Sequence, residues 1–193
     1  MDTLVFIKEA LLENRWTGAI TPSSKALAET ITDMVGLEKA KVVVEYGPGT
    51  GVFTETILRK KRPDAYFLAM EVNPRFVEAT LERCPGANVV NDCAQNTVNY
   101  LRKAGFEKCD AIVSGLPWTR FDETLQDAIL EATYDVLAPG GRFVTFGYTF
   151  SPYFPLGRRF FCKKFPARFK KNSYTAPIWN NFPPCSVYIG EKI

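Results

Sequence analysis

A short segment of the chain alternates glycine with other residues and carries an acid just ahead of it. It reads Glu45-Tyr46-Gly47-Pro48-Gly49-Thr50-Gly51. Glycines at alternate positions let a backbone turn tightly and approach a ligand closely. Enzymes that bind a nicotinamide dinucleotide carry G-x-G-x-x-G instead, whose backbone cradles a pyrophosphate. The spacing here favours a ligand with a cationic amino-acid end and no phosphate, and a glycine-rich turn without a ligand is the alternative.

Two further acids follow predicted strands. Glu71 ends the second predicted strand, and Asp92 follows the third. An acid at the end of the second strand can accept hydrogen bonds from both hydroxyls of a ribose, and one after the third strand can accept from the amino group of an adenine. Acids at three successive strand ends are hard to explain as solvated surface. With their neighbours Val72 and Cys93, they predict a site for a ligand that contains an amino acid, a ribose and an adenine.

Composition excludes several other chemistries. The chain has no histidine, which removes Ser-His-Asp and Cys-His catalysis and histidine-bound metals, and we expect no metal. Its five cysteines show no paired spacing, so we expect free thiols. No apolar run approaches the ~20 residues of a membrane-spanning helix. The apolar stretch Leu4–Ile7 is too short for a signal-peptide core, so we expect a cytoplasmic location.

The acids and glycines need a sheet to position them, and the pattern of the chain predicts one. Apolar clusters alternate with helix-like segments, which is typical of a parallel sheet with crossover helices. The predicted strands are 41–46, 65–72, 87–90, 110–114 and 142–148. The predicted helices between them are 51–61, 73–83, 94–104 and 122–137. We expect one α/β domain, an open and mostly parallel Rossmann-like sheet with helices on both faces, with 186–190 pairing at an edge with a segment near 173–180.

The ends of the chain extend this core. Two helices are expected ahead of the sheet, one over about 3–14 and one that starts at Thr21-Pro22. The expected parts are therefore a helical cover (1–38), a cofactor-binding core (39–150) and a C-terminal segment for substrate or membrane (151–193).

The charge of +3 is unevenly distributed. Residues 1–135 hold 15 basic and 20 acidic residues, whereas residues 136–193 hold 9 basic residues and one acid. This asymmetry predicts a basic surface for a polyanion, either nucleic acid or an anionic membrane.

Over about residues 40–150 the sequence resembles the class I S-adenosylmethionine-dependent methyltransferases. The resemblance rests on the glycine segment and the three acids. It implies a seven-stranded methyltransferase sheet and S-adenosyl-L-methionine as the cofactor, bound also by the loop after the fourth strand through Ser114, Gly115 and Leu116. Amino-methylating members carry Asn/Asp/Ser-x-Pro-aromatic at Ser114-Gly115-Leu116-Pro117-Trp118. RNA adenine-N6 methyltransferases hold the amine with the asparagine, so Gly115 in its place counts against nucleic acid.

Three more stretches resemble the bacterial phospholipid N-methyltransferases: Gly18–Ala28, Gly115–Pro117 and Asn181–Tyr188. With the glycine segment, this similarity covers about residues 5–190. It implies methylation of the amine of phosphatidylethanolamine-type phospholipid, and a peripheral position on the inner face of the membrane. In that family the N-terminal region contacts the membrane and covers the cofactor.

The acceptor in such a reaction is a neutral amine. An amine of ordinary basicity has a pKa of roughly 10.4, so its deprotonation at pH 7 costs about 4–5 kcal/mol, and an apolar, aromatic-lined site lowers that pKa. Tyr148, Trp118 and Tyr46 are the aromatic residues expected there, and we assign Tyr148 and Trp118 to catalysis. Core packing is the alternative for both.

The acceptor's phosphate needs a cation, and we expect Arg158 and Arg159 to bind it, with Pro117 beside the amine. Further basic residues follow, interleaved with aromatic ones: Phe154, Phe160, Phe161, Lys163, Lys164, Phe165, Arg168, Phe169, Lys170 and Lys171. This mixture is typical of a membrane-surface segment, and it also suits single-stranded RNA. A solvated basic loop with its aromatics turned inward is the third interpretation. An RNA adenine-N6 methyltransferase and a non-catalytic membrane-binding protein are therefore the rival functions.

Overall fold

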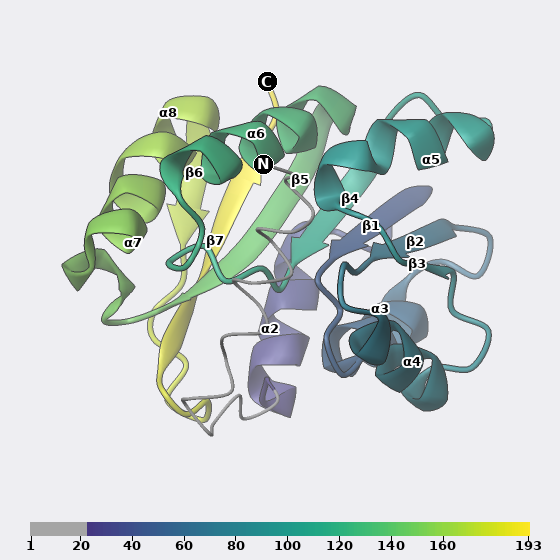
Figure 1. The fold of residues 1–193 in the computed structure, drawn as a ribbon, viewed down its shortest axis with the longest axis horizontal. Coiled ribbons are helices and arrows are strands. Elements are labelled where there is room, and N and C mark those ends of the chain that lie inside the picture. The colour runs from purple at the N-terminus through teal and green to yellow at the C-terminus, as the bar shows by residue number, and fades with distance from the viewer. Residues whose placement is uncertain (1–22) are drawn as a thin grey trace.

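The computed structural model describes residues 23–193, and its centre is a seven-stranded sheet in the order β3-β2-β1-β4-β5-β7-β6 (Figure 1). The strands are β1 (Val42–Tyr46), β2 (Tyr66–Met70), β3 (Val89–Val90), β4 (Cys109–Ser114), β5 (Leu137–Tyr148), β6 (Lys171–Tyr174) and β7 (Cys185–Glu191). The first five pair in parallel, and β7 lies antiparallel between β5 and β6. The predicted fold class is confirmed.

Helices cover both faces of the sheet (Figure 1). They are α2 (Lys25–Val35), α3 (Val52–Lys60), α4 (Pro74–Arg83), α5 (Thr97–Lys103) and α6 (Glu123–Val136), with the short helix η2 (Ala94–Asn96) before α5. Strand side chains alternate between the faces. Val43 packs with α2 and α3 in one apolar cluster, whereas Val42 and Val44 pack with α5 and α6 in another. This alternation gives the molecule two cores, one on each side of the sheet.

The helix starts follow from their capping residues. Asn73 accepts a hydrogen bond from the Arg75 amide at 3.0 Å with Pro74 at the first position, as the sequence predicts. α2 begins at Lys25, because the Ser24 hydroxyl accepts from the Leu27 amide at 3.1 Å. The predicted helix over 3–14 and the start at Thr21-Pro22 lie outside the described residues. No helix within 23–193 is both long and apolar enough to span a bilayer.

Between β5 and β6 the chain forms four short helices that the sequence did not predict. They are η3 (Ser151–Tyr153), α7 (Pro155–Arg159), η4 (Phe160–Lys164) and α8 (Phe165–Arg168). Their aromatic residues Phe160, Phe161 and Phe165, together with Phe169, are buried against the sheet. Phe161 lies so close to Gly147 that a β-carbon there would stand 2.6 Å from its ring. The expectation that these four aromatics enter a membrane is therefore wrong, and only Phe154 of the set is exposed.

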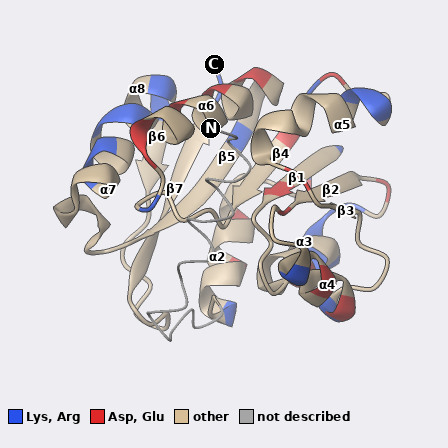
Figure 2. Cartoon of the chain, in the orientation of Figure 1, with Lys and Arg blue, Asp and Glu red and all other residues tan. Residues whose placement is uncertain are grey.

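The basic C-terminal segment is partly neutralised by acids from α6, which lies beside it (Figure 2). Arg159 pairs with Glu123, Lys164 with Asp127 at 2.7 Å, and Arg168 with Asp135 at 3.7 Å. Lys171 pairs with Glu191. Acids and bases that are separate in the sequence meet in space, so the segment is less basic than its composition predicts.

Candidate active site

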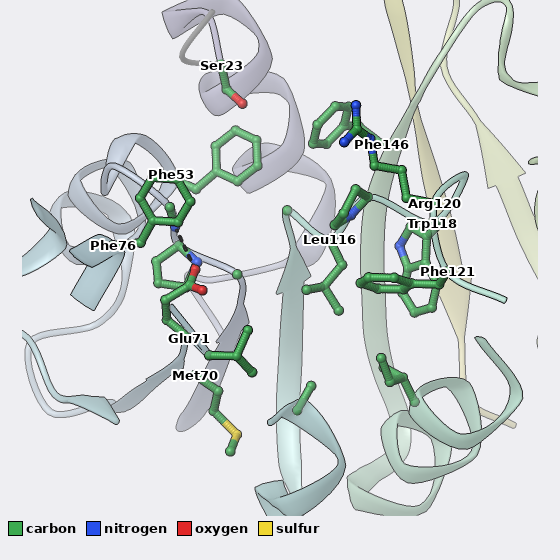
Figure 3. Close-up of a pocket in the computed structure, with 18 of the residues that line it drawn as sticks. Ser23, Phe53, Met70, Glu71, Phe76, Leu116, Trp118, Arg120, Phe121 and Phe146 are labelled. Atoms are coloured by element: carbon green, nitrogen blue, oxygen red, sulfur yellow. Dashed lines mark hydrogen bonds between the residues drawn. The ribbon is translucent and has the colours of Figure 1, made fainter. Parts of the chain in front are cut away.

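A cavity of about 350 Å³ opens at the carboxyl ends of the parallel strands (Figure 3). The loops after β1 to β5 all contribute to its wall. Glu71, Met70 and Phe76 lie on one side of it, and Trp118, Arg120 and Phe146 lie on the other (Figure 3). Of the predicted site residues, those that line it are Gly47, Pro48, Gly49, Thr50, Glu71, Val72, Asp92, Cys93, Gly115, Leu116, Pro117, Trp118 and Tyr148.

The glycine segment forms the loop between β1 and α3. Gly47, Gly49 and Gly51 have φ angles of 66°, 59° and 80°, in a region that residues with a side chain rarely adopt. The Gly51 amide donates to the Pro48 carbonyl at 2.9 Å, which closes the turn. Gly51 does not line the cavity; it precedes α3 and packs on Thr80 of α4. The rest of the loop presents bare backbone to the cavity, which lets a ligand come close.

Glu71 fixes this loop from the neighbouring strand. One carboxylate oxygen accepts from the Gly49 amide at 3.3 Å and the other from the Asn73 amide at 2.9 Å. The side chain is 4% exposed and lines the cavity. Burial raises the pKa of Glu71, although the two amide hydrogen bonds oppose that rise. Glu71 is therefore a preorganised acceptor at the cavity wall.

Asp92 is less buried than Glu71 and has more hydrogen-bond donors around it. It accepts from the Cys93 amide at 2.7 Å, the Asn96 amide group at 2.9 Å and the Tyr100 hydroxyl at 3.0 Å. Partial burial opposes ionisation, but these hydrogen bonds outweigh it and lower the pKa of Asp92. The second wall acid is consequently ionised at neutral pH.

Glu45 and Tyr46 do not line the cavity, contrary to expectation. Both belong to β1 itself, so their side chains enter the two cores beneath the loop. The Glu45 carboxyl is 0% exposed and accepts from the Thr54 hydroxyl at 2.7 Å, and burial raises its pKa to about 8. The Tyr46 hydroxyl accepts from Thr97 at 3.0 Å on the opposite face. Glu45 supports the glycine loop from below, through α3.

The loop after β4 packs its glycine directly against the glycine loop. A β-carbon on Gly115 would stand 2.6 Å from the Gly47 carbonyl oxygen, and the Gly115 amide donates to the Tyr46 carbonyl at 2.8 Å. An asparagine at this position, as in the adenine-N6 pattern, has no room unless the two loops move apart. Ser114 is buried beneath the loop and lies outside the cavity wall.

Trp118 is both a wall residue and a core residue. Its indole is 1% exposed and donates to the Thr145 hydroxyl at 2.9 Å. It stacks on Phe160 with ring centroids 4.0 Å apart. Trp118 is thus packed in the core, as the alternative interpretation expects, and it also lines the cavity.

Tyr148 belongs to a row of aromatic rings along one wall. Phe53 meets Phe146 edge-on at 6.0 Å, and Phe146 meets Tyr148 at 5.8 Å. Burial raises the pKa of Tyr148, so its phenol is neutral at physiological pH and is not a general base. Sequence reasoning missed Phe53 and Phe146. Phe146 had a usable signal, since it stands two residues before Tyr148 on the same face of a strand.

The structure does not bring Arg158 and Arg159 to the cavity. Both are exposed on α7, where Arg159 is already paired with Glu123. Arg120 is the arginine in the wall, two residues beyond Trp118. Sequence reasoning missed it because a lone arginine in a loop carries no pattern.

The stretches that resemble phospholipid N-methyltransferases come together around this cavity. The Ser24 amide donates to the Asn181 side chain at 3.0 Å, although 157 positions separate the two residues. Ser23 lines the cavity, as does Gly115–Pro117. The part of Gly18–Ala28 before Ser23 lies outside the described residues.

Solved structures share this fold. An O-methyltransferase from Bacillus cereus, in complex with SAH, superposes with a TM-score of 0.69 at 15% identity over 100% of this chain and 92% of that one. The O-methyltransferase TomG from Streptomyces achromogenes, in complex with SAM, gives a TM-score of 0.67 at 15% identity over 100% and 91%. No protein-family model matches the chain.

A curated methyltransferase of Singulisphaera acidiphila is 32% identical to the chain over 145 residues, which are 74% of this chain and 76% of that protein. With the shared sheet, this identity and coverage show that the chain belongs to the class I S-adenosylmethionine-dependent methyltransferases. That relative is named ornithine lipid N-methyltransferase. Malonyl-[acyl-carrier protein] O-methyltransferase 1 of Ilyobacter polytropus is 28% identical over 114 residues, 58% of this chain and 40% of that protein.

The cavity wall fits S-adenosylmethionine. The loop of Gly47 and Gly49 offers backbone without a β-carbon in the way, and Glu71 and Asp92 supply hydrogen-bond acceptors on the same side. Apolar side chains, Val72 and Met70 among them, complete that side. The wall opposite Glu71 is aromatic, which leaves room there for the molecule that accepts the methyl group.

Proposed function

We propose that the protein methylates the amine of a membrane aminolipid, with phosphatidylethanolamine and ornithine lipid as the candidate acceptors. The observation that carries this proposal is the match over 74% of the chain to a lipid N-methyltransferase. Both headgroups contain an amine and an anion, a phosphate in one and a carboxylate in the other. The aromatic half of the cavity supports an amine acceptor independently.

On the cofactor side, we propose that Glu71 accepts from the ribose hydroxyls and Asp92 from the adenine amino group. The glycine loop would hold the amino-acid end by its backbone. Bound there, S-adenosylmethionine supplies a methyl group on a positively charged sulfur. The task of these residues is to fix its direction, because methyl transfer needs the accepting nitrogen in line with the breaking bond.

On the acceptor side, Phe53, Phe146 and Tyr148 would surround the amine. An apolar environment disfavours the ammonium form and lowers the pKa of the amine. Once the neutral nitrogen forms its bond to carbon, it becomes a cation again, which aromatic faces stabilise by roughly 0.5–2 kcal/mol each. Since Tyr148 is a neutral phenol, the proton leaves to solvent, and Tyr148 orients the amine.

An exposed aromatic rim supports access from a bilayer. Its members are Phe150, Tyr153, Phe154, Trp179 and Phe182, which are 41%, 88%, 53%, 75% and 83% exposed, respectively. Phe150 stacks on the cavity residue Tyr148 at 5.3 Å, and the Thr149 amide donates to the Pro184 carbonyl at 3.0 Å. The rim is therefore continuous with the cavity wall. Aromatic rings of this kind enter the headgroup layer of a membrane.

Transfer of labelled methyl groups tests the proposal. The protein is incubated with labelled S-adenosylmethionine and with vesicles of phosphatidylethanolamine, vesicles of ornithine lipid, or RNA. We expect label in at least one lipid and none in RNA. Label in RNA alone would support the adenine-N6 alternative, and label in no acceptor would support a non-catalytic binding protein.

A further inference from the structure

We propose that Arg120 binds the anionic group of the acceptor's zwitterionic headgroup and so sets the position of the amine. This assignment rests on the proposed function. It replaces Arg158 and Arg159, which lie away from the cavity, as the site for the headgroup anion.

The charge distribution of the cavity leads to Arg120. Within residues 23–193, Arg120 is the one basic side chain in the wall, whereas Glu71 and Asp92 are its acids. Arg120 and Glu71 lie on opposite sides of the cavity (Figure 3). A ligand held on the side of Glu71 leaves the aromatic side, with Arg120, for the acceptor.

Arg120 also lacks an acidic partner in the described part of the chain. No carboxylate there comes within ion-pair distance of it, and its side chain has no hydrogen-bond acceptor. Arg159 and Arg168 of the C-terminal segment, by contrast, pair with acids of α6. A guanidinium is the side chain best suited to hold a carboxylate or phosphate by two parallel hydrogen bonds.

The backbone that carries Arg120 is firmly held, although its side chain is exposed. The Arg120 amide donates to the Pro117 carbonyl at 2.9 Å. The buried Gln126 amide group donates to the carbonyls of Trp118 at 2.7 Å and Phe121 at 3.2 Å, on either side of Arg120. The guanidinium therefore extends from a fixed point, as a specificity-determining residue requires.

The position of Arg120 suits the chemistry of the amine as well. Its positive charge acts on Tyr148, where it opposes the rise in pKa that burial causes. A cation at this place disfavours the ammonium form of an acceptor beside Tyr148 in the same way. Arg120 would thus bind the anion of the headgroup and help to keep the amine neutral.

Kinetics on matched lipids test the assignment. Activity of wild type, Arg120→Ala and Arg120→Lys is measured in mixed micelles with phosphatidylethanolamine, with ornithine lipid, and with the methyl ester of whichever lipid is accepted, which keeps the amine but lacks the anionic charge. Arg102→Ala, which removes an exposed arginine of α5 outside this cavity, is the matched control. The two natural lipids distinguish a phosphate from a carboxylate as the bound anion.

We expect Arg120→Ala to raise KM for the accepted lipid by about 10- to 100-fold, the range for loss of a hydrogen bond to a charged group. Arg120→Lys should recover part of this loss. Arg120→Ala should change KM for the methyl ester far less, and cofactor affinity measured by calorimetry should not change.

Two results would overturn the assignment in different ways. An equal rise in KM for the lipid and its methyl ester, or no rise at all, would overturn the role of Arg120 alone. A wild-type enzyme that methylates no lipid would overturn the proposed function, and the role of Arg120 with it.

Discussion

The acids at the first three strands look alike in the sequence but occupy different surroundings. Glu71 and Asp92 follow β2 and β3 and reach the cavity, whereas Glu45 lies within β1 and is enclosed. The sequence predicted all three as ligand-facing. The predicted end of β1 at Tyr46 was right, but Glu45 lies one residue inside that end, so its side chain enters a core of the sheet and does not reach the loop.

Glu71→Gln tests the cofactor side. Loss of the charge should weaken the hydrogen bonds that we assign to the ribose, and cofactor affinity should fall by about 10- to 100-fold. Calorimetry measures this. Glu78→Gln, which changes an exposed acid of α4 outside the cavity, should leave affinity unchanged. Equal affinities for wild type and Glu71→Gln would contradict the assignment.

Glu45 gives a prediction about pH. Its folded pKa is about 8, against an ordinary value of 4.5. Between these values the folded protein keeps a proton that the unfolded chain loses, so this group lowers the free energy of unfolding as pH rises. Glu45→Gln should therefore be more stable than wild type at pH 8, by roughly 2–4 kcal/mol. The difference should shrink towards pH 5.

Thermal unfolding of both proteins at pH 5, 6.5 and 8 measures this. Glu71 also has a raised pKa and is present in both proteins, so its own contribution has the same sign in wild type and variant. A stability difference that is constant across the pH range would show that Glu45 is not the titrating group.

At the scale of elements, the parallel strands were predictable and the C-terminal helices were not. Runs such as Val42–Val44 are short and β-branched, which defines a buried strand. The segment from η3 to α8 is divided by Pro152, Pro155 and Pro166, so no single helical period runs through it. Its aromatic residues therefore gave no sign of which way they face.

Gln126 connects three of these elements. Its buried amide group donates from α6 to the loop after β4 and to the Leu156 carbonyl of α7 at 3.3 Å. Gln126→Ala leaves buried carbonyls without a donor and should cost about 1–3 kcal/mol of stability. It should also raise KM for the acceptor, because the backbone that carries Arg120 is no longer held in place.

Chemical denaturation and lipid kinetics measure the two effects. Glu131→Ala, on the exposed face of the same helix, is the control and should change neither. If Gln126→Ala loses stability but keeps the wild-type KM, the Gln126 amide group stabilises the fold without positioning Arg120.

At the scale of the molecule, charge and aromatic residues are arranged differently from what composition alone predicts. The acids of α6 pair with three basic residues of the C-terminal segment (Figure 2). Exposed aromatics gather instead at the end of the sheet where the cavity opens. The sequence predicted a membrane-surface segment in the C-terminal third of the chain, but it could not distinguish buried rings from exposed ones.

The rim should therefore dominate membrane binding. Changing both Trp179 and Phe182 to serine should weaken binding to vesicles roughly 10-fold, because two rings no longer enter the interface. Ile193→Ser, at the opposite end of the sheet and equally exposed, should have little effect. Sedimentation with vesicles measures both, and equal binding by wild type and the double variant would exclude the rim as the contact.

The atom that receives the methyl group is the most direct test of the account. Related members of this class are named for both nitrogen and oxygen transfer. Tandem mass spectrometry of lipid products, made with isotope-labelled cofactor, locates the methyl group. We predict that it lies on the headgroup nitrogen of the aminolipid. A methyl group found on an oxygen, of the lipid or of any other acceptor in the same mixture, would contradict the proposal that the aromatic wall binds an amine.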